Sequence, residues 1–191
     1  GLLAGRPPAE RVLAAEPPAV DALAQPYPFY TDQDLAHRLV YVEAARGCPF
    51  QCEFCLSALD HRVRPFALEP LLAELETLWQ RGARTFKFVD RTFNSSLAAA
   101  ARILDFFLAR TPPFHVHFEV IPDHFPASLR ERLARFPAST LQLEIGIQTL
   151  DAATAARINR RLDLERIREN LRFLEEETTA HLHLDLIVGL P

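Results

Sequence analysis

The sequence predicts an α/β fold, a partial TIM-like (β/α) barrel built on parallel strands. From residue 39 onward, strand patterns alternate with helix patterns, which is typical of βαβ units and a parallel sheet. Along the later strands, apolar residues share one face and polar residues share the other. A doubly wound sheet carries helices on both faces and is apolar on both, so the pattern favours a barrel with a polar interior.

Five short apolar runs are expected to form the strands. They lie at 39–44, 85–89, 115–120, 141–147 and 182–188. The polar positions of the last three strands are His115, His117 and Glu119, then Gln142, Glu144 and Gln148, then His181, His183 and Asp185. Because no sixth strand pattern follows, we expect the barrel to stop after its fifth strand.

The segments between these strands show helical spacing. Helices are predicted at 68–80, from about 94 to 110, at 127–135, at 151–158 and at 163–176. Pro70 falls in the first turn of the first helix, a position that proline tolerates. Asn94, Ser95 or Ser96 is the expected cap of the second helix, because short polar side chains accept the free N–H groups there.

Residues 1–38 differ from the rest of the chain, because prolines interrupt every short apolar run. Proline fixes φ and lacks an N–H, so this stretch is not expected to form a central strand or a long helix. We interpret it as a linker or arm preceding a core at 39–191. The aromatic run at 26–30 is expected to pack on that core.

The composition excludes several classes of protein. The chain has 191 residues, is 49% hydrophobic and carries a formal charge of −4, which argues against nucleic-acid binding as a main task. No apolar run reaches the ~18 residues of a membrane span, and no secretory leader is visible, so we expect a cytoplasmic protein. The start at Gly1 without any Met, and the stop at Pro191 after a strand, predict a piece of a longer chain.

The three cysteines carry the strongest chemical signal. Cys48, Cys52 and Cys55 fall in the loop after the first strand, where parallel α/β folds place their chemistry. Their odd number does not suit a closed disulfide framework, and a redox Cys-x-x-Cys pair would not need Cys48. Zinc would require a fourth ligand such as His61. A 4Fe-4S cluster held by three thiolates would leave one iron open to a substrate or cofactor.

The spacing Cys-x3-Cys-x2-Cys, with Phe54 before the last cysteine, resembles the radical S-adenosylmethionine (SAM) superfamily. The resemblance covers about 39–191. The segment 39–55 is similar to the opening segment of members that carry an N-terminal cobalamin-binding domain, and the proline-rich arm is similar to the linker between those domains. The cobalamin motif Asp-x-His-x-x-Gly is absent here, so such a domain would lie outside this chain.

The resemblance implies both cofactors and a mechanism. Cys48, Cys52 and Cys55 would hold a 4Fe-4S cluster, and the open iron would bind the methionine part of SAM. An electron from a donor such as flavodoxin or ferredoxin would then cleave SAM to a 5′-deoxyadenosyl radical, or SAM would serve with cobalamin in methyl transfer. The substrate, a small molecule or a peptide, cannot be read from the sequence.

The resemblance also implies SAM-contacting residues at the strand ends. Asp90 follows the second strand, where the family places a polar segment that contacts the SAM amino group. Glu119 ends the third strand, and Glu144 and Gln148 end the fourth, where the family contacts ribose and carboxylate. Gly189 follows the fifth strand, where the family's backbone meets adenine. A capping role in the turn before the next helix is the alternative for Asp90.

Other motifs leave two further hypotheses open. The pairs His115/His117 and His181/His183 predict a barrel metallohydrolase if they bind a metal, or polar interior residues bonded to their neighbours if they do not. A zinc-stabilised, non-enzymatic module is the other hypothesis. The arginines from 157 to 172 alternate with glutamates, which favours a solvated helix face over a phosphate or RNA site.

Overall fold

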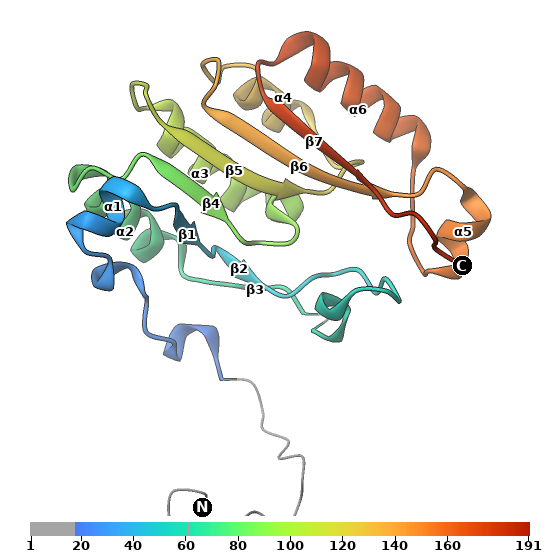
Figure 1. The fold of residues 1–191 in the computed structure, drawn as a ribbon, viewed down its shortest axis with the longest axis horizontal. Helices are drawn as coiled ribbons and strands as arrows, with labels where there is room; N and C mark the ends of the chain where they lie inside the picture. The colour runs from blue at the N-terminus through green and yellow to red at the C-terminus, as the bar shows by residue number, and fades with distance from the viewer. Residues whose placement is uncertain (1–17, 61) are drawn as a thin grey trace, which may run out of the picture.

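The computed structural model describes residues 18–60 and 62–191, so the predictions for 1–17 and for His61 lie outside the described residues. Five strands form one sheet in the order β1-β4-β5-β6-β7, and each neighbouring pair is parallel (Figure 1). The strands are β1 Val40–Val42, β4 Thr85–Phe88, β5 His115–Val120, β6 Leu141–Gln148 and β7 His181–Leu186. In the described chain β1 and β7 are the free edges, so the sheet is an open, partial barrel, and the predicted fold class is confirmed.

Within the described residues, six α-helices accompany the sheet. They are α1 Asp32–His37, α2 Leu68–Gln80, α3 Leu97–Leu108, α4 Ala127–Leu133, α5 Ala152–Arg157 and α6 Leu164–Glu177. Apolar residues of α2, α3, α4 and α6 bury against one face of the strands in a single core. Among the residues described, every helix is too short or too polar to span a lipid bilayer.

The apolar face of the sheet forms the centre of this core. Phe88 on β4 and Phe118 on β5 are fully buried, and Phe118 stacks on Phe93 with ring centroids 3.9 Å apart. The opposite face carries the polar residues, as the alternation predicts. Strand β7 is less covered than expected, because it is an edge strand; Leu184 and Leu186 remain 48% and 60% exposed.

The predicted cap of α3 is partly wrong. Ser96 occupies the cap position, but its side chain accepts no hydrogen bond there. Asn94 is fully buried and serves the neighbouring strand end instead. Its amide donates to the carbonyls of Ile121 and His124, and its oxygen accepts from the N–H of Ile121 at 2.7 Å. The loop before α3 therefore turns inward, and Asn94 satisfies the free backbone groups that follow β5.

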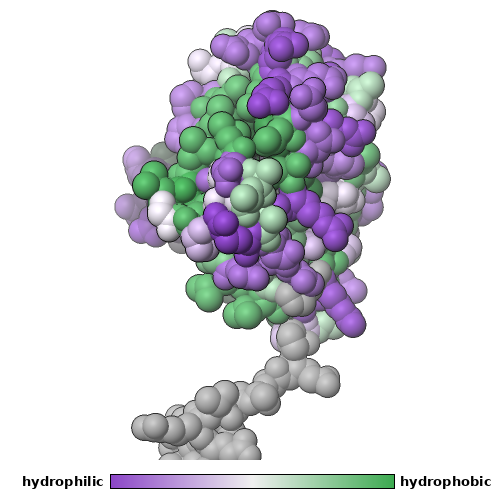
Figure 2. All heavy atoms as spheres, turned by 90° about the vertical axis from the view of Figure 1, so that its right-hand side faces the viewer, coloured by the Kyte–Doolittle hydropathy of each residue, from purple (hydrophilic) through white to green (hydrophobic). Residues whose placement is uncertain are grey.

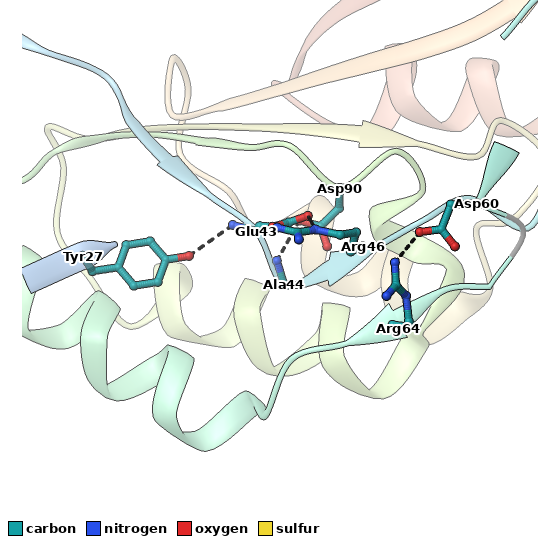
Figure 3. Close-up of polar contacts among 7 residues, drawn as sticks. All are labelled: Tyr27, Glu43, Ala44, Arg46, Asp60, Arg64 and Asp90. Atoms are coloured by element: carbon teal, nitrogen blue, oxygen red, sulfur yellow. Dashed lines mark hydrogen bonds and ion pairs between the residues drawn. The ribbon is translucent and has the colours of Figure 1, made fainter. Parts of the chain in front are cut away.

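The aromatic part of the arm packs on the core, as expected (Figure 3). Tyr27 is 2% exposed, and its hydroxyl accepts the N–H of Glu43 at 3.2 Å. The hydroxyl of Tyr30 accepts the N–H of Tyr41 at 3.1 Å. Sequence reasoning missed helix α1 in this arm. A capping box between Thr31 and Asp34 starts that helix.

Two very short strands were also missed. β2 Ala45–Arg46 and β3 Arg64–Pro65 pair antiparallel, and the N–H of Phe66 donates to the carbonyl of Ala44 at 2.9 Å. The pair closes the base of the long loop that carries the three cysteines. Two residues are too few to show a period of two in the sequence.

The buried carboxyl group of Asp90 makes a further contact where the cysteine loop begins. Asp90, which follows β4, is 4% exposed and accepts the N–H of Ala44 at 2.9 Å (Figure 3). Burial raises the pKa of Asp90 to about 7, while the N–H groups of Ala44 and Ala45 act in the opposite direction. This carboxyl ties the exit of β1 to the end of β4.

Asp90 should make stability depend on pH. Because its pKa in the folded protein lies above that of the unfolded chain, folding favours the protonated form, and stability should fall as pH rises from about 4 to about 7. In Asp90→Asn that fall should disappear, a difference of ~4 kcal/mol at most. Urea unfolding of both proteins at a series of pH values from 4 to 8 measures it. If the free energies of unfolding of the two proteins differ by the same amount at every pH, the raised pKa of Asp90 is contradicted.

Candidate functional site

A cavity of about 470 Å³ opens at the carboxyl ends of the strands. The thiol loop, the strand ends and the segment after α5 line it together. Its polar and sulfur-bearing lining residues are Cys48, Cys52, Cys55, Ser57, Arg91, Thr92, Glu119, Glu144, Gln148, Arg160 and Asp185. Figure 2 looks onto this end of the molecule, where hydrophobic and hydrophilic side chains lie side by side. The structure therefore brings the predicted cysteines together with Glu119, Glu144 and Gln148.

The cysteine loop is a wrapped turn rather than an extended excursion. The N–H of Cys48 donates to the carbonyl of Asp60 at 3.1 Å, and the N–H of Cys55 donates to that of Cys52 at 3.0 Å. Gly47 has a φ of 99°, and a Cβ there would lie 2.2 Å from the carbonyl oxygen of Arg62. Both the left-handed conformation and this close backbone approach require glycine.

All three cysteines are free thiols, and Cys52 is the most buried at 5% exposure. Burial raises the pKa of Cys48; the neighbouring Cys52 and Cys55 add to the rise, and Arg160 opposes it. Phe54, the aromatic residue before the last cysteine, lines the same cavity and is 41% exposed. The three cysteines and the ring of Phe54 therefore line the same cavity.

The donor set fits an iron–sulfur cluster. Three cysteine thiols line one cavity, and a 4Fe-4S cluster is held by thiolates that each bind a separate iron. A single zinc would need a fourth ligand, and the one expected from the sequence, His61, lies outside the described residues.

The acidic side of the cavity is already paired with cations. Glu119 lies 3.2 Å from Nη1 of Arg91, and burial raises the pKa of Glu119 while Arg91 lowers it. Oε2 of Glu144 lies 3.4 Å from Nζ of Lys87 and 3.0 Å from Nε2 of His117, the latter off a hydrogen-bond direction. Glu144, on β6, is therefore contacted from the adjacent strand β5 and from β4 beyond it.

The histidine pairs form no metal site in the described chain. Burial, with a smaller effect of Lys87, lowers the pKa of His117, and the contact with Glu144 acts in the opposite direction. The rings of His181 and His183 meet edge to face at 4.9 Å. His117 is buried beside Glu144 without a hydrogen bond, and His181 and His183 are exposed on the edge strand, so the expected interior residues bonded to their neighbours are not found in the described chain.

The end of β6 contains a bulge that the sequence did not reveal. The register with β7 shifts between Gly146 and Gln148, and Gln148 has a φ of 71°. A Cβ on Gly146 would lie 2.2 Å from Nε2 of Gln148. The small residue is therefore needed because the Gln148 side chain folds over it. Bulges often redirect side chains beside active sites.

Two predicted site residues lie away from the cavity lining. Asp90 accepts the N–H of Ala44 after β1, as described above, and so contacts a neighbouring strand exit rather than capping the turn before the next helix. Gly189 follows β7 with a φ of 84°, in a turn where a Cβ would meet nothing within 4 Å.

Arg160 was placed wrongly by sequence reasoning. It was expected on a solvated helix face, but it lies between α5 and α6 and lines the cavity. Its Nη1 is 3.6 Å from Sγ of Cys52, and its Nη2 donates to the carbonyl of Gly146. Arg166 and Arg168 do lie on an exposed helix face, each beside an acidic residue.

Fold and site together define a parallel α/β partial barrel with a three-thiol loop at the carboxyl edge of its sheet. The family model of the radical SAM superfamily matches residues 42–191. The chain belongs to this superfamily.

The chain is similar in sequence to two kinds of protein. A tRNA-2-methylthio-N(6)-dimethylallyladenosine synthase of Chlorobium limicola is 29% identical over 157 residues, which are 78% of this chain and 36% of that protein. An uncharacterized methyltransferase of Synechocystis sp. is 40% identical over 77 residues, 38% of this chain and 14% of that protein. The chain spans about a third of the first relative's length.

Solved structures share the fold. TsrM from Kitasatospora setae, a radical S-adenosylmethionine methyltransferase solved with tryptophan and a SAM analogue, matches with a TM-score of 0.67 at 19% identity, over 80% of this chain and 31% of that one. OxsB, a cobalamin-dependent S-adenosylmethionine radical enzyme, matches with a TM-score of 0.61 at 20% identity, over 77% and 23% of the two chains.

Gly47→Ala should damage the cysteine loop specifically. Gly82→Ala is the matched control, because Gly82 has a similar φ of 101° but open space where a Cβ would go. Both variants should lose ~1–3 kcal/mol of stability from the positive φ. Only Gly47→Ala should also lose iron and sulfide uptake on anaerobic reconstitution. Equal uptake by both variants would show that the close approach to Arg62 is unimportant.

Proposed function

We propose that this chain is the catalytic core of a radical SAM enzyme, which binds a 4Fe-4S cluster through Cys48, Cys52 and Cys55 and cleaves SAM reductively. The observation that carries the proposal is the shared cavity, which the three thiols line together with Glu119, Glu144 and Gln148. These residues come from separate strand ends, as expected for a site that holds a cluster on one side and a nucleoside on the other.

Each residue that lines the cavity has its own proposed role in binding SAM or protecting the cluster. The bound cluster would supply the electron that breaks the C–S bond of the SAM sulfonium. Glu144 and Gln148 would accept from ribose hydroxyls, and the ion contacts of Glu144 hold its carboxylate in place. Glu119 would meet the SAM amino group, and the half-exposed ring of Phe54 would screen the thiol loop from water.

Methyl transfer with cobalamin is the reaction that we favour for the whole protein. TsrM is described as a methyltransferase and its structure holds cobalamin and a 4Fe-4S cluster, while OxsB is described as cobalamin-dependent. The cobalamin would be held outside the described residues. An electron donor such as flavodoxin or ferredoxin is the proposed partner.

Cys52→Ser should abolish cluster binding. The parent protein should take up about four irons and four sulfides per chain and absorb in the blue part of the visible spectrum. The variant should retain less than half of both, because only two thiolates remain. Iron and sulfide assays after anaerobic reconstitution measure this, with Ser57→Ala, in the same loop, as the control. Uptake of one zinc without sulfide by the parent would refute the proposal.

Glu144→Gln should weaken SAM binding while leaving the cluster intact. The loss of a carboxylate acceptor should cost about tenfold in affinity, or ~1.4 kcal/mol. Calorimetric titration of SAM into the reconstituted protein, normalised to iron content, measures this. Glu165→Gln is the control, because that side chain is 94% exposed on α6. A parallel loss of iron and SAM would indicate a structural role for Glu144.

A further inference from the structure

Arg160 lines the cavity, and its guanidinium group approaches the sulfur of Cys52. Its Nη1 is 3.6 Å from Sγ of Cys52, within hydrogen-bond reach of a sulfur acceptor. Its Nε is buried and has no acceptor among residues 18–60 and 62–191. A guanidinium has five N–H donors, so this side chain retains unused donors in a space lined by thiols.

The charge of Arg160 differs from that of its neighbours. Arg91 is neutralised by Glu119, and Lys87 by Glu144. The contacts of the Arg160 guanidinium within the described chain are a sulfur and the carbonyl of Gly146, neither of which is a carboxylate. Its positive charge therefore acts mainly on the thiol side of the cavity.

The surrounding chain holds Arg160 in this position. The N–H of Glu53 donates to the carbonyl of Ile158 at 3.1 Å, and Nδ2 of Asn159 donates to the carbonyl of Gln51 at 3.1 Å. The segment 158–160 is thus fastened to both neighbours of Cys52. With Gly146 as a further anchor, the guanidinium is fixed between the end of β6 and the cysteine loop.

We propose that Arg160 is a positioning residue that donates an N–H to the Cys52 sulfur and raises the reduction potential of the cluster. This inference rests on the proposed function, because it requires the cluster to bind. Reduction adds one negative charge to the cluster. A fixed cation and an N–H···S hydrogen bond stabilise that added charge more than they stabilise the oxidised state.

The experiment is a redox titration of the reconstituted full chain, followed by electron paramagnetic resonance. Arg160→Gln keeps a polar side chain but removes the charge, and Arg161→Gln is the matched control, because Arg161 is the exposed neighbouring residue. At equal iron content, Arg160→Gln should lower the equilibrium constant for reduction about tenfold, which is ~59 mV for a one-electron couple. Arg161→Gln should leave the potential unchanged.

A merely structural role would not reproduce this result. If Arg160→Gln carries a full cluster at the parent's potential, the inference is overturned while the proposed function stands. A parent that binds no cluster overturns both. If Arg160→Gln loses its cluster, Arg160→Met carries the test, because it keeps an unbranched side chain but has neither charge nor N–H donor. A full cluster with a potential below the parent's supports the inference, and a full cluster at the parent's potential overturns it.

Discussion

The hydrogen bond from the N–H of Ala44 to the buried carboxyl of Asp90 joins two strand ends where the chain leaves the sheet. The loop that follows carries every thiol of the chain and would otherwise be tethered only at its ends. The β2–β3 pair closes the loop at its base. Hydrogen bonds from Glu53 to Ile158 and from Asn159 to Gln51 hold the middle of the loop against the segment 158–160. The position of the sulfurs relative to the sheet therefore depends on contacts made by residues with no sulfur chemistry of their own.

The parallel register supplies the other wall of the cavity. Glu119 lies opposite Glu144 across β5 and β6, and Gly146 lies opposite Asp185 across β6 and β7. Residues from separate βα units thus reach the same edge at the same height, because parallel strands align their carboxyl ends. The two glutamates would repel each other if both were unpaired. Arg91 and Lys87 balance them, which lets two carboxylates share one partly buried wall.

Sequence reasoning succeeded where a pattern was long enough to be periodic. The limits of β5 and α2 agree with prediction, since apolar spacing over six or more residues distinguishes strand from helix. The cysteine spacing located one wall of the cavity. Features set by tertiary contact were missed: the two-residue strands β2 and β3, the inward turn of Asn94, and the placement of Arg160. A local sequence window contains no information about which distant carbonyl or sulfur a side chain will meet.

The charges are distributed unequally between the two sides of the cavity, and this distribution determines which ligands each side can stabilise. On the strand side, the carboxylates are matched by cations and leave several acceptor oxygens for a sugar or an amino group. On the thiol side, Arg160 brings a charge without a carboxylate partner in the described chain. A group that gains negative charge is stabilised beside Arg160, whereas the paired carboxylates of Glu119 and Glu144 offer hydrogen-bond acceptors without a large net charge. The proposed cluster needs the first environment and the hydroxyl and amino groups of SAM need the second, so the two sides of one cavity suit the two proposed ligands.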